Sequence, residues 1–202
     1  MIIQSKKDYV YFLAVDKIAL NITKKRPNPF YDEIWKFERL LRKSEYYQNC
    51  KKDMLSKSYG KYIQYQTHKL SLKLGFRIPT NVFGPGLSIA HYGPIIVNVG
   101  AKVGCNCRLH NCITIGTQAG YDDLAPKIGD NVYIGPGAVI VGSIKIADGI
   151  AIGANSYVNK SFEEPDVTIA GAPAKIISKK GSKNYYHRAT EIYNSMNQSR
   201  RG

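Results

Sequence analysis

The sequence has few cysteines, few acidic residues and no long apolar run. Its 202 residues include 4 cysteines, and 15 aspartates and glutamates stand against 29 lysines and arginines. No stretch approaches the roughly 18 consecutive apolar residues of a membrane-spanning helix, which predicts a chain that is not transmembrane. A chain of this length needs no disulfide framework, and the four cysteines do not suggest one.

No secretory signal is expected in the first residues. The short apolar run from Tyr9 to Val15 is bracketed by Asp8 and Asp16, and no small-residue cleavage site follows it. We therefore expect a cytoplasmic protein. Its composition, 44% hydrophobic and 22% charged, excludes wholesale disorder.

The shortage of acidic residues leaves a net charge of +14, which first suggests an anionic partner. The net charge is +10 over residues 1–77, +1 over 78–160 and +3 over 161–202. This shift predicts a basic N-terminal region (1–77), a central domain (78–179) and a polar tail (180–202), the last a short helix or a frayed end. No helix-turn-helix or RNA-binding signature is present, so nucleic acid is not expected, while membrane contact through the basic region stays open.

Three helices are predicted before the central domain. The first spans 6–21 after Ser5 as a cap, with Phe12, Val15, Ala19 and Ile22 at helical spacing. The second spans 32–47, with Ile34, Phe37, Leu40 and Leu41 on one face, and the third spans about 54–73, with Tyr59, Ile63 and Leu70 as core candidates. Their lysines and arginines are expected on solvated faces.

The central domain carries a six-residue repeat. Branched apolar residues recur in two runs, which are Val97, Val103, Leu109 and Ile115, then Ile128, Ile134, Ile140, Ile146, Ile152 and Val158. Neither a helical period of 3.6 nor strand alternation gives this spacing, whereas three hexads that close one triangular turn do. We therefore predict stacked coils with the branched residues inside.

The repeat is interrupted between Ile115 and Ile128, where the spacing is 13 rather than 12. The intervening segment is polar and contains glycine. An excursion from a rigid coil is where a repeat protein usually builds a binding feature, although a tolerated surface insertion is the plain alternative.

Five segments carry a family resemblance: Gly86–Val97, Ile113–Thr117, Pro126–Asp130, Ile134–Ala138 and Ile169–Lys175. In their order they resemble the hexapeptide-repeat acyltransferases of the serine acetyltransferase branch, over about half of the chain. The resemblance implies a mainly β fold, a left-handed parallel β-helix behind an N-terminal α-helical region. It also implies homotrimers that bind acetyl-CoA in the cleft between neighbouring subunits, and we expect no metal.

Two histidines are the candidate catalytic residues. His91 matches the family position of the general base, and an imidazole has nearly the basicity needed to take a hydroxyl proton at neutral pH. If residues 18 apart stack, His91 lies under Leu109 and Tyr92 under His110, so His110 should be near His91. His110 either orients the base or caps a corner.

The same resemblance implies a cofactor site of backbone amides and small residues. The matching positions are Gly116, Thr117, Gly135, Gly153, Ala154 and Ala172, with Lys175 placed to meet a phosphate. These small residues also suit the repeat itself. Cys105, Cys107, His110 and Cys112 superficially resemble a zinc motif, but strand geometry would point them to different faces.

Three positions depart from the family. Ala90 replaces an aspartate before the catalytic histidine, Ala125 replaces a histidine before Pro126–Lys127, and Arg77 replaces an upstream aspartate. These departures predict that acetyl-CoA remains the donor while the acceptor changes from L-serine to a sugar hydroxyl of a surface polysaccharide or its precursor. The acceptor-side candidates are Arg77, Tyr92, Tyr121, Asp122 and Asp123. Genuine serine O-acetyltransferase activity and a non-catalytic β-helix scaffold remain the alternatives.

Overall fold

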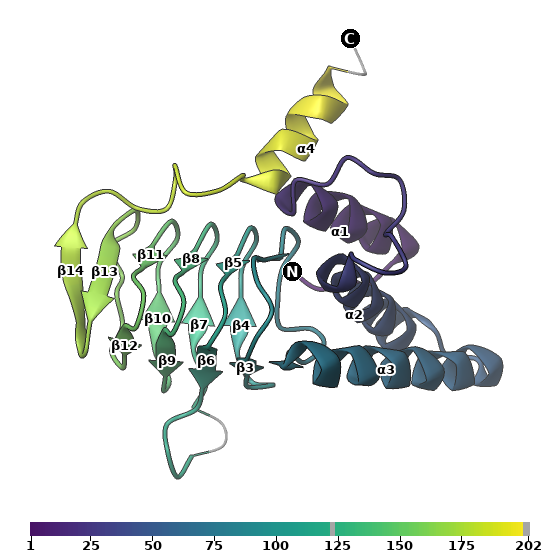
Figure 1. The fold of residues 1–202 in the computed structure, drawn as a ribbon, viewed down its shortest axis with the longest axis horizontal. Coiled ribbons are helices and arrows are strands. Elements are labelled where there is room, and N and C mark those ends of the chain that lie inside the picture. The colour runs from purple at the N-terminus through teal and green to yellow at the C-terminus, as the bar shows by residue number, and fades with distance from the viewer. Residues whose placement is uncertain (122–123, 200–202) are drawn as a thin grey trace.

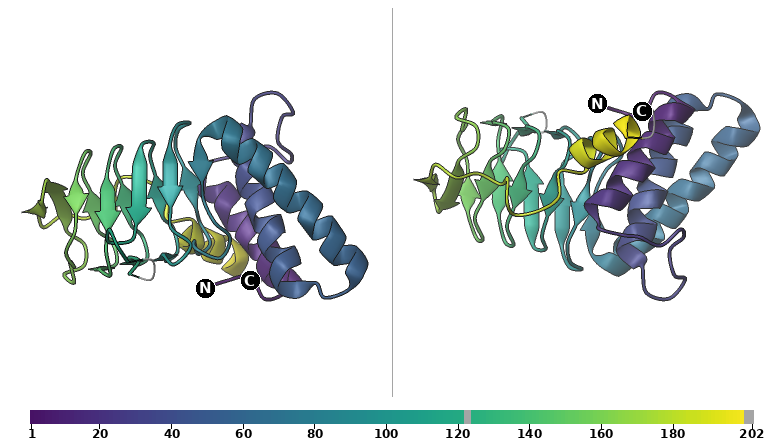
Figure 2. Two further views of the ribbon diagram at one scale, coloured as in Figure 1. Left: turned by 90° about the horizontal axis from the view of Figure 1, so that it is seen from below. Right: turned by 90° about the horizontal axis from the view of Figure 1, so that it is seen from above.

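A computed structural model describes residues 1–121 and 124–199 (Figure 1). A helical region packs against one end of a β-helix, and the C-terminal segment runs back along the β-helix to the helical region (Figures 1 and 2). None of the helices in the described residues is long and apolar enough to cross a membrane.

The N-terminal helices are α1 (Lys6–Ala19), α2 (Glu33–Cys50) and α3 (Met54–Leu74). Ser5 caps α1 as expected, because its hydroxyl accepts a hydrogen bond from the Asp8 amide. Most predicted core positions are buried or packed against the core, but Tyr59 is 42% exposed. Its ring packs instead against Tyr47 of α2, with centroids 5.2 Å apart.

Three sheets form the β-helix, and all their pairs are parallel except β13–β14. Sheet 1 has the order β1–β3–β6–β9–β12, sheet 2 β4–β7–β10, and sheet 3 β2–β5–β8–β11–β13–β14. The strands are β1 (Phe76–Arg77), β2 (Ser88–Ile89), β3 (Ile95–Val97), β4 (Lys102–Val103), β5 (Arg108–Leu109), β6 (Ile113–Gly116), β7 (Lys127–Ile128), β8 (Tyr133–Ile134), β9 (Val139–Val141), β10 (Lys145–Ile146), β11 (Ala151–Ile152), β12 (Tyr157–Val158), β13 (Thr168–Gly171) and β14 (Ala174–Ser178).

The predicted left-handed β-helix of hexapeptide repeats, preceded by a helical region, is confirmed. All ten repeat positions are at most 4% exposed and form one core. Full burial of each such side chain stabilises the fold by about 1.5–3 kcal/mol. A single coil could not bury these side chains, because their upper and lower sides would remain exposed to water without neighbouring coils. Asparagine occupies corners that need positive φ, such as Asn106 (54°) and Asn131 (58°).

The register between β2 and β5 differs from the predicted 18 residues, whereas β3 and β6 keep it. Ile89 pairs with Leu109, an offset of 20, so His91 does not lie under Leu109 and Tyr92 does not lie under His110. The cause is the connection that contains His91. Ile89 to Val97 spans eight positions, whereas the stacked step from Leu109 to Ile115 spans six. The corner of His91 is therefore two residues longer than the one stacked on it.

The excursion follows β6 and leads to β7. Ile115 to Ile128 spans 13 positions, whereas the next step between the same sheets, Ile140 to Ile146, spans six. The interruption is therefore one corner enlarged by seven residues, visible below β6 in Figure 1. Asp122 and Asp123 lie outside the described residues.

A buried charge network joins the helical region to the first coil. The Arg42 side chain is fully buried and donates from Nε to Asp16 (2.7 Å), from Nη1 to Glu45 (3.1 Å) and the Phe83 carbonyl (2.8 Å), and from Nη2 to the Gly84 carbonyl (2.7 Å). Burial lowers the pKa of Arg42, but Asp16 and Glu45 outweigh it and raise that pKa above its ordinary value. Asp16 also accepts from the Gly86 and Leu87 amides, which locks α1 and α2 to the coil that leads into β2.

The C-terminal segment ends in α4 (Ala189–Gln198), which packs on α1. On the way it crosses sheet 3, where the Tyr186 hydroxyl donates to the Asn106 carbonyl (2.6 Å) and Tyr185 packs against Tyr133. The predicted tail is thus a short helix held to both parts of the molecule.

Candidate functional site

His91 lies in the enlarged corner between β2 and β3, at the end of the β-helix that meets the helical region. The corner leaves its side chain exposed. His110 directly follows β5 and stacks beside Ala90 in the register that pairs Ile89 with Leu109. The two imidazole rings nevertheless come together, with centroids 5.3 Å apart and planes inclined by 57°. The expected proximity of the two histidines is confirmed, although not by the expected stacking.

The surroundings of His110 favour its neutral form. Burial lowers the pKa of His110, and the positive charges of Arg108 and His91 lower it further. On its other side the His110 ring packs against Tyr133, with centroids 5.1 Å apart. A neutral His110 does not add a second positive charge beside His91 when His91 takes up a proton.

A small cavity of about 250 Å³ lies beside this corner, between the β-helix and the helical region. Ala90, Tyr92 and Arg108 line it from the β-helix, and Tyr31, Asp32 and Trp35 are among the residues that line it from the other side. The Asp32 carboxylate already accepts from the Asn28 amide (2.6 Å) and Lys24 (3.2 Å), and the Asn28 bond is the main reason that the pKa of Asp32 is lowered. The Arg108 guanidinium donates to Ser88 Oγ (2.7 Å).

A buried carboxylate lies behind this cavity. Glu38 Oε1 accepts from the Ile89 amide (3.1 Å), while Oε2 has no hydrogen-bond partner among the described residues. Burial raises the pKa of Glu38 well above its ordinary value, and the neighbouring Asp16 raises it further. Burial thus favours the protonated form of Glu38, in which the carboxyl group costs less to keep away from water.

The edge between sheets 3 and 1 continues from the histidines as a row of small residues. The positions that stack after Ala90 and His110 are Gly135, Gly153 and Ala170. Ala154 is exposed on the same edge, and Lys175 pairs with Ala170 across β13 and β14, next to the turn that holds Ala172. This row extends from the histidine pair to the far end of the β-helix.

Not every glycine of the predicted cofactor set is explained by packing. A Cβ on Gly135 would come within 2.8 Å of the Ala154 amide nitrogen, and a Cβ on Gly153 would come within 2.9 Å of Ala170 Cβ. A Cβ on Gly116, in contrast, would meet nothing closer than 3.6 Å. The repeat itself requires glycine at the first two positions but leaves room at Gly116.

Gly116 and Thr117 lie on the other edge of sheet 1, where β6 leads into the excursion. Tyr121 is exposed within that excursion. In a single chain, sheet 1 therefore separates these residues from His91. Arg77 is also apart, because it lines a different cavity of about 580 Å³ with His68 and other residues of α3.

The sequence predictions thus found His91, His110 and Tyr92 of this corner and missed Arg108, Asp32 and Trp35. Arg108 occupies the outward strand position two residues before His110, a signal that could have been used. Asp32 and Trp35 lie at the start of α2, far away in the sequence, and no local pattern marks them.

The cysteines do not form a metal site: within the described residues they belong to no group of three or more ligand residues that could hold a metal ion. Burial raises the pKa of Cys105 to about 11, while Cys107 lies in the core and Cys112 is exposed.

Comparisons with known proteins find relatives of the repeat region. Residues 125–160 match the family described as bacterial transferase hexapeptide (six repeats). A serine acetyltransferase of Buchnera aphidicola subsp. Acyrthosiphon pisum is 36% identical over 110 residues, which is 54% of this chain and 40% of that protein. The matched part of the chain therefore covers less than half the length of that relative.

Solved structures match beyond the β-helix. The serine acetyltransferase of Brucella abortus strain S19 superposes with a TM-score of 0.64 and 26% identity, covering 88% of this chain and 72% of that one. A structure of the Brucella abortus enzyme in complex with coenzyme A gives a TM-score of 0.63 at 25% identity, covering 87% and 70%.

The fold and the repeat define a hexapeptide-repeat protein with a left-handed β-helix. Within that class, the chain resembles the serine acetyltransferase branch of the hexapeptide-repeat acyltransferases, in sequence and in structure.

Proposed function

We propose that the protein is an acetyl-CoA-dependent O-acetyltransferase of the cytoplasm. The observation that carries the proposal is the His91–His110 pair, 5.3 Å apart, at the head of a row of small residues on a hexapeptide β-helix. Relatives with this repeat are named serine acetyltransferases, and a structural neighbour is described in complex with coenzyme A.

In the proposed reaction His91 is the general base. Its imidazole takes the proton of the acceptor hydroxyl as the oxygen attacks the thioester carbonyl, which forms the new C–O bond. A backbone amide of the coil stabilises the oxyanion, the C–S bond then breaks, and the proton passes from His91 to the departing CoA sulfur. Because the pKa of His110 is lowered, its neutral form is favoured beside the imidazolium of His91.

The cofactor would lie along the edge that begins at His91 and passes Gly135, Gly153 and Ala154. Ala172 and Lys175 stand at its far end, where an ammonium group can meet a phosphate. Gly116 and Thr117 would contribute from the opposite edge of sheet 1 in a neighbouring subunit. The free space over Gly116 supports a close approach by the pantetheine arm.

A homotrimer is part of this proposal. The outward face of sheet 1 carries apolar side chains, with Ile96 47% exposed and Val99, just after β3, 71% exposed. If three such faces meet around an axis, the Gly116 edge of one subunit approaches the His91 edge of the next. A complete site then needs two subunits.

L-serine is the first candidate acceptor, because the comparisons favour it over a sugar. A sugar hydroxyl is the second candidate. It is favoured by Ala90 at the corner and by aromatic walls from Tyr31, Trp35 and Tyr92, while Asp32 is already committed to Lys24 and Asn28. Carbohydrate rings stack on such walls, and among the described lining residues Asp32 is the one carboxylate that an amino acid's ammonium group could meet.

The test measures thiol release from acetyl-CoA with L-serine and with a panel of sugars. Turnover with either acceptor that is lost in His91→Ala supports the acetyltransferase. Turnover with serine alone would reject the sugar. If the protein binds acetyl-CoA but transfers to neither class, or does not bind it in a thermal-shift titration, the proposed reaction is wrong and a scaffold role gains support.

A further inference from the structure

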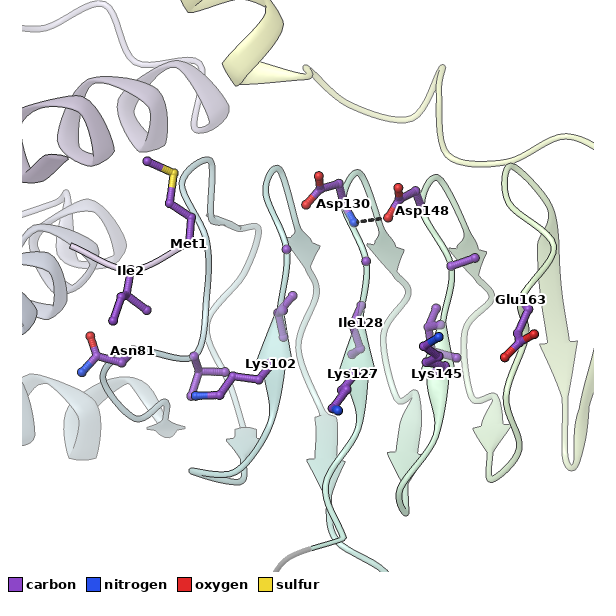
Figure 3. Close-up of a pocket in the computed structure, with 16 residues that line it drawn as sticks. Met1, Ile2, Asn81, Lys102, Lys127, Ile128, Asp130, Lys145, Asp148 and Glu163 are labelled. Atoms are coloured by element: carbon purple, nitrogen blue, oxygen red, sulfur yellow. Dashed lines mark hydrogen bonds between the residues drawn. The ribbon is translucent and has the colours of Figure 1, made fainter. Parts of the chain in front are cut away.

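A further cavity in the described part of the chain lies away from the histidines. It has a volume of about 680 Å³ and covers the outward face of sheet 2, with Met1 and Ile2 at one end (Figure 3). No histidine and no aromatic residue lines it. Its lining residues have no part in the proposed acetyl transfer.

Three lysines stand in register on this face. Lys102, Lys127 and Lys145 are direct partners on β4, β7 and β10, so they follow one another at the strand spacing of about 4.8 Å (Figure 3). All three are exposed, and none forms an ion pair within the described residues. We call them the lysine column. Like charges directly opposite one another destabilise a sheet, and a bound anion would offset that repulsion.

Two carboxylates run parallel to the column on the other side of the cavity. Asp130 Oδ1 accepts from the Cys105 amide (2.6 Å), and Asp148 Oδ1 accepts from the Asp130 amide (2.7 Å), the bond drawn in Figure 3. Their second oxygens make no hydrogen bond in the described chain. Between lysines and carboxylates the floor consists of Gly104, Gly129 and Ala147.

The combination of lysines, carboxylates and small residues favours some classes of anionic ligand over others. The lysine column attracts repeated negative charges, while the free carboxylate oxygens accept hydrogen bonds from neutral hydroxyl groups. The small residues of the floor let a ring lie against the backbone. A nucleic acid would find no aromatic side chain for its bases, and its phosphates would face the carboxylates.

We propose that the outward face of sheet 2 binds an extended acidic saccharide, with its anionic groups on the lysine column and its hydroxyls on Asp130 and Asp148. The proposal does not rest on the acetyl-transfer reaction. It assigns a binding site on a different face of the β-helix from His91.

The test is calorimetric titration of the full chain, without acetyl-CoA, with oligogalacturonate and with its methyl ester, which keeps the sugar backbone but masks the charges. We expect binding of the acid that weakens with salt, and much weaker binding of the ester. Lys127→Gln should weaken binding about twofold to fivefold, while Lys61→Gln, which removes the same charge from exposed α3, should not. Thermal unfolding should show that Lys127→Gln is folded and no less stable.

A second variant separates saccharide recognition from simple charge attraction. Asp148→Asn keeps an oxygen for the Asp130 amide but removes the free carboxylate. Weaker binding of oligogalacturonate together with stronger binding of tripolyphosphate supports the saccharide. If Asp148→Asn strengthens both, if the ester binds as well as the acid, or if CoA displaces the oligosaccharide, the proposal is wrong.

Discussion

The imidazole rings of His91 and His110 lie 5.3 Å apart on successive coils, although the register places His110 beside Ala90. The two additional residues of the β2–β3 corner make this possible, because they carry His91 out of the stacked edge. The pair therefore depends on an irregularity in the repeat. His91 is exposed, as a general base that contacts a substrate must be, and its neighbour His110 is half-buried.

His91→Ala is expected to lower kcat by about 10²–10⁴-fold, because the acceptor hydroxyl loses its general base. The binding of acetyl-CoA should change little, since the row of small residues remains. Steady-state kinetics together with a CoA titration measure both effects. His187→Ala, which changes an exposed histidine of the C-terminal segment, is the matched control, and equal activity of the two variants would refute the role of His91.

His110 makes the fold sensitive to acid. Its pKa is lowered by burial, so below about pH 6.5 the unfolded chain binds a proton that the folded chain refuses, and stability falls as the pH falls through this window. His110→Gln should therefore show a smaller drop in Tm between about pH 7.5 and 5.5 than the parent. His187→Gln serves as the comparison, and an unchanged drop in His110→Gln would contradict the assignment.

The repeat could be predicted from the sequence, whereas the lengths of the irregular corners could not. One branched residue every six positions reports directly on the interior, so the coils follow from local spacing. Ile95 and Val97 both point inward, and nothing in the pattern shows that this lengthens the corner of His91. The interruption after Ile115 could be seen in the sequence. However, a spacing of 13 residues does not show whether one corner of the coil is enlarged or two corners are.

The contacts of the helical region lay beyond sequence reasoning for a different reason. Arg42 appears in the sequence as one of many basic residues on amphipathic helices, yet it is fully buried. Its partners Asp16 and the Phe83 carbonyl are 26 and 41 positions away. Such a network depends on tertiary packing, and the same holds for the wall that Trp35 gives to the small cavity.

Arg42→Met is expected to destabilise the protein by about 3–5 kcal/mol, because it leaves Asp16 and Glu45 buried without their counter-charge. Chemical denaturation measures the loss. Arg39→Met is the control, since Arg39 is half-buried, lies over Trp35 at 5.7 Å and should cost no more than about 1 kcal/mol. Similar costs for the two variants would mean that the network does not anchor the helical region.

The glycines of the β-helix separate packing from ligand binding. Gly135→Ala places a methyl group 2.8 Å from the Ala154 amide nitrogen and 2.9 Å from the Ile152 carbonyl, so we expect a loss of about 1–3 kcal/mol in the free energy of unfolding. In Gly116→Ala the added methyl group comes no closer than 3.6 Å to any other atom, so the free energy of unfolding should change by less than about 0.5 kcal/mol.

Gly116→Ala also tests the cofactor site. If the pantetheine arm passes over Gly116, the added methyl group should raise KM for acetyl-CoA by about tenfold, because the thioester must move away from His91. Denaturation curves of both variants measure the stability changes, and steady-state kinetics with acetyl-CoA measure KM. A Gly116→Ala enzyme with normal stability and normal KM would remove this edge from the cofactor site.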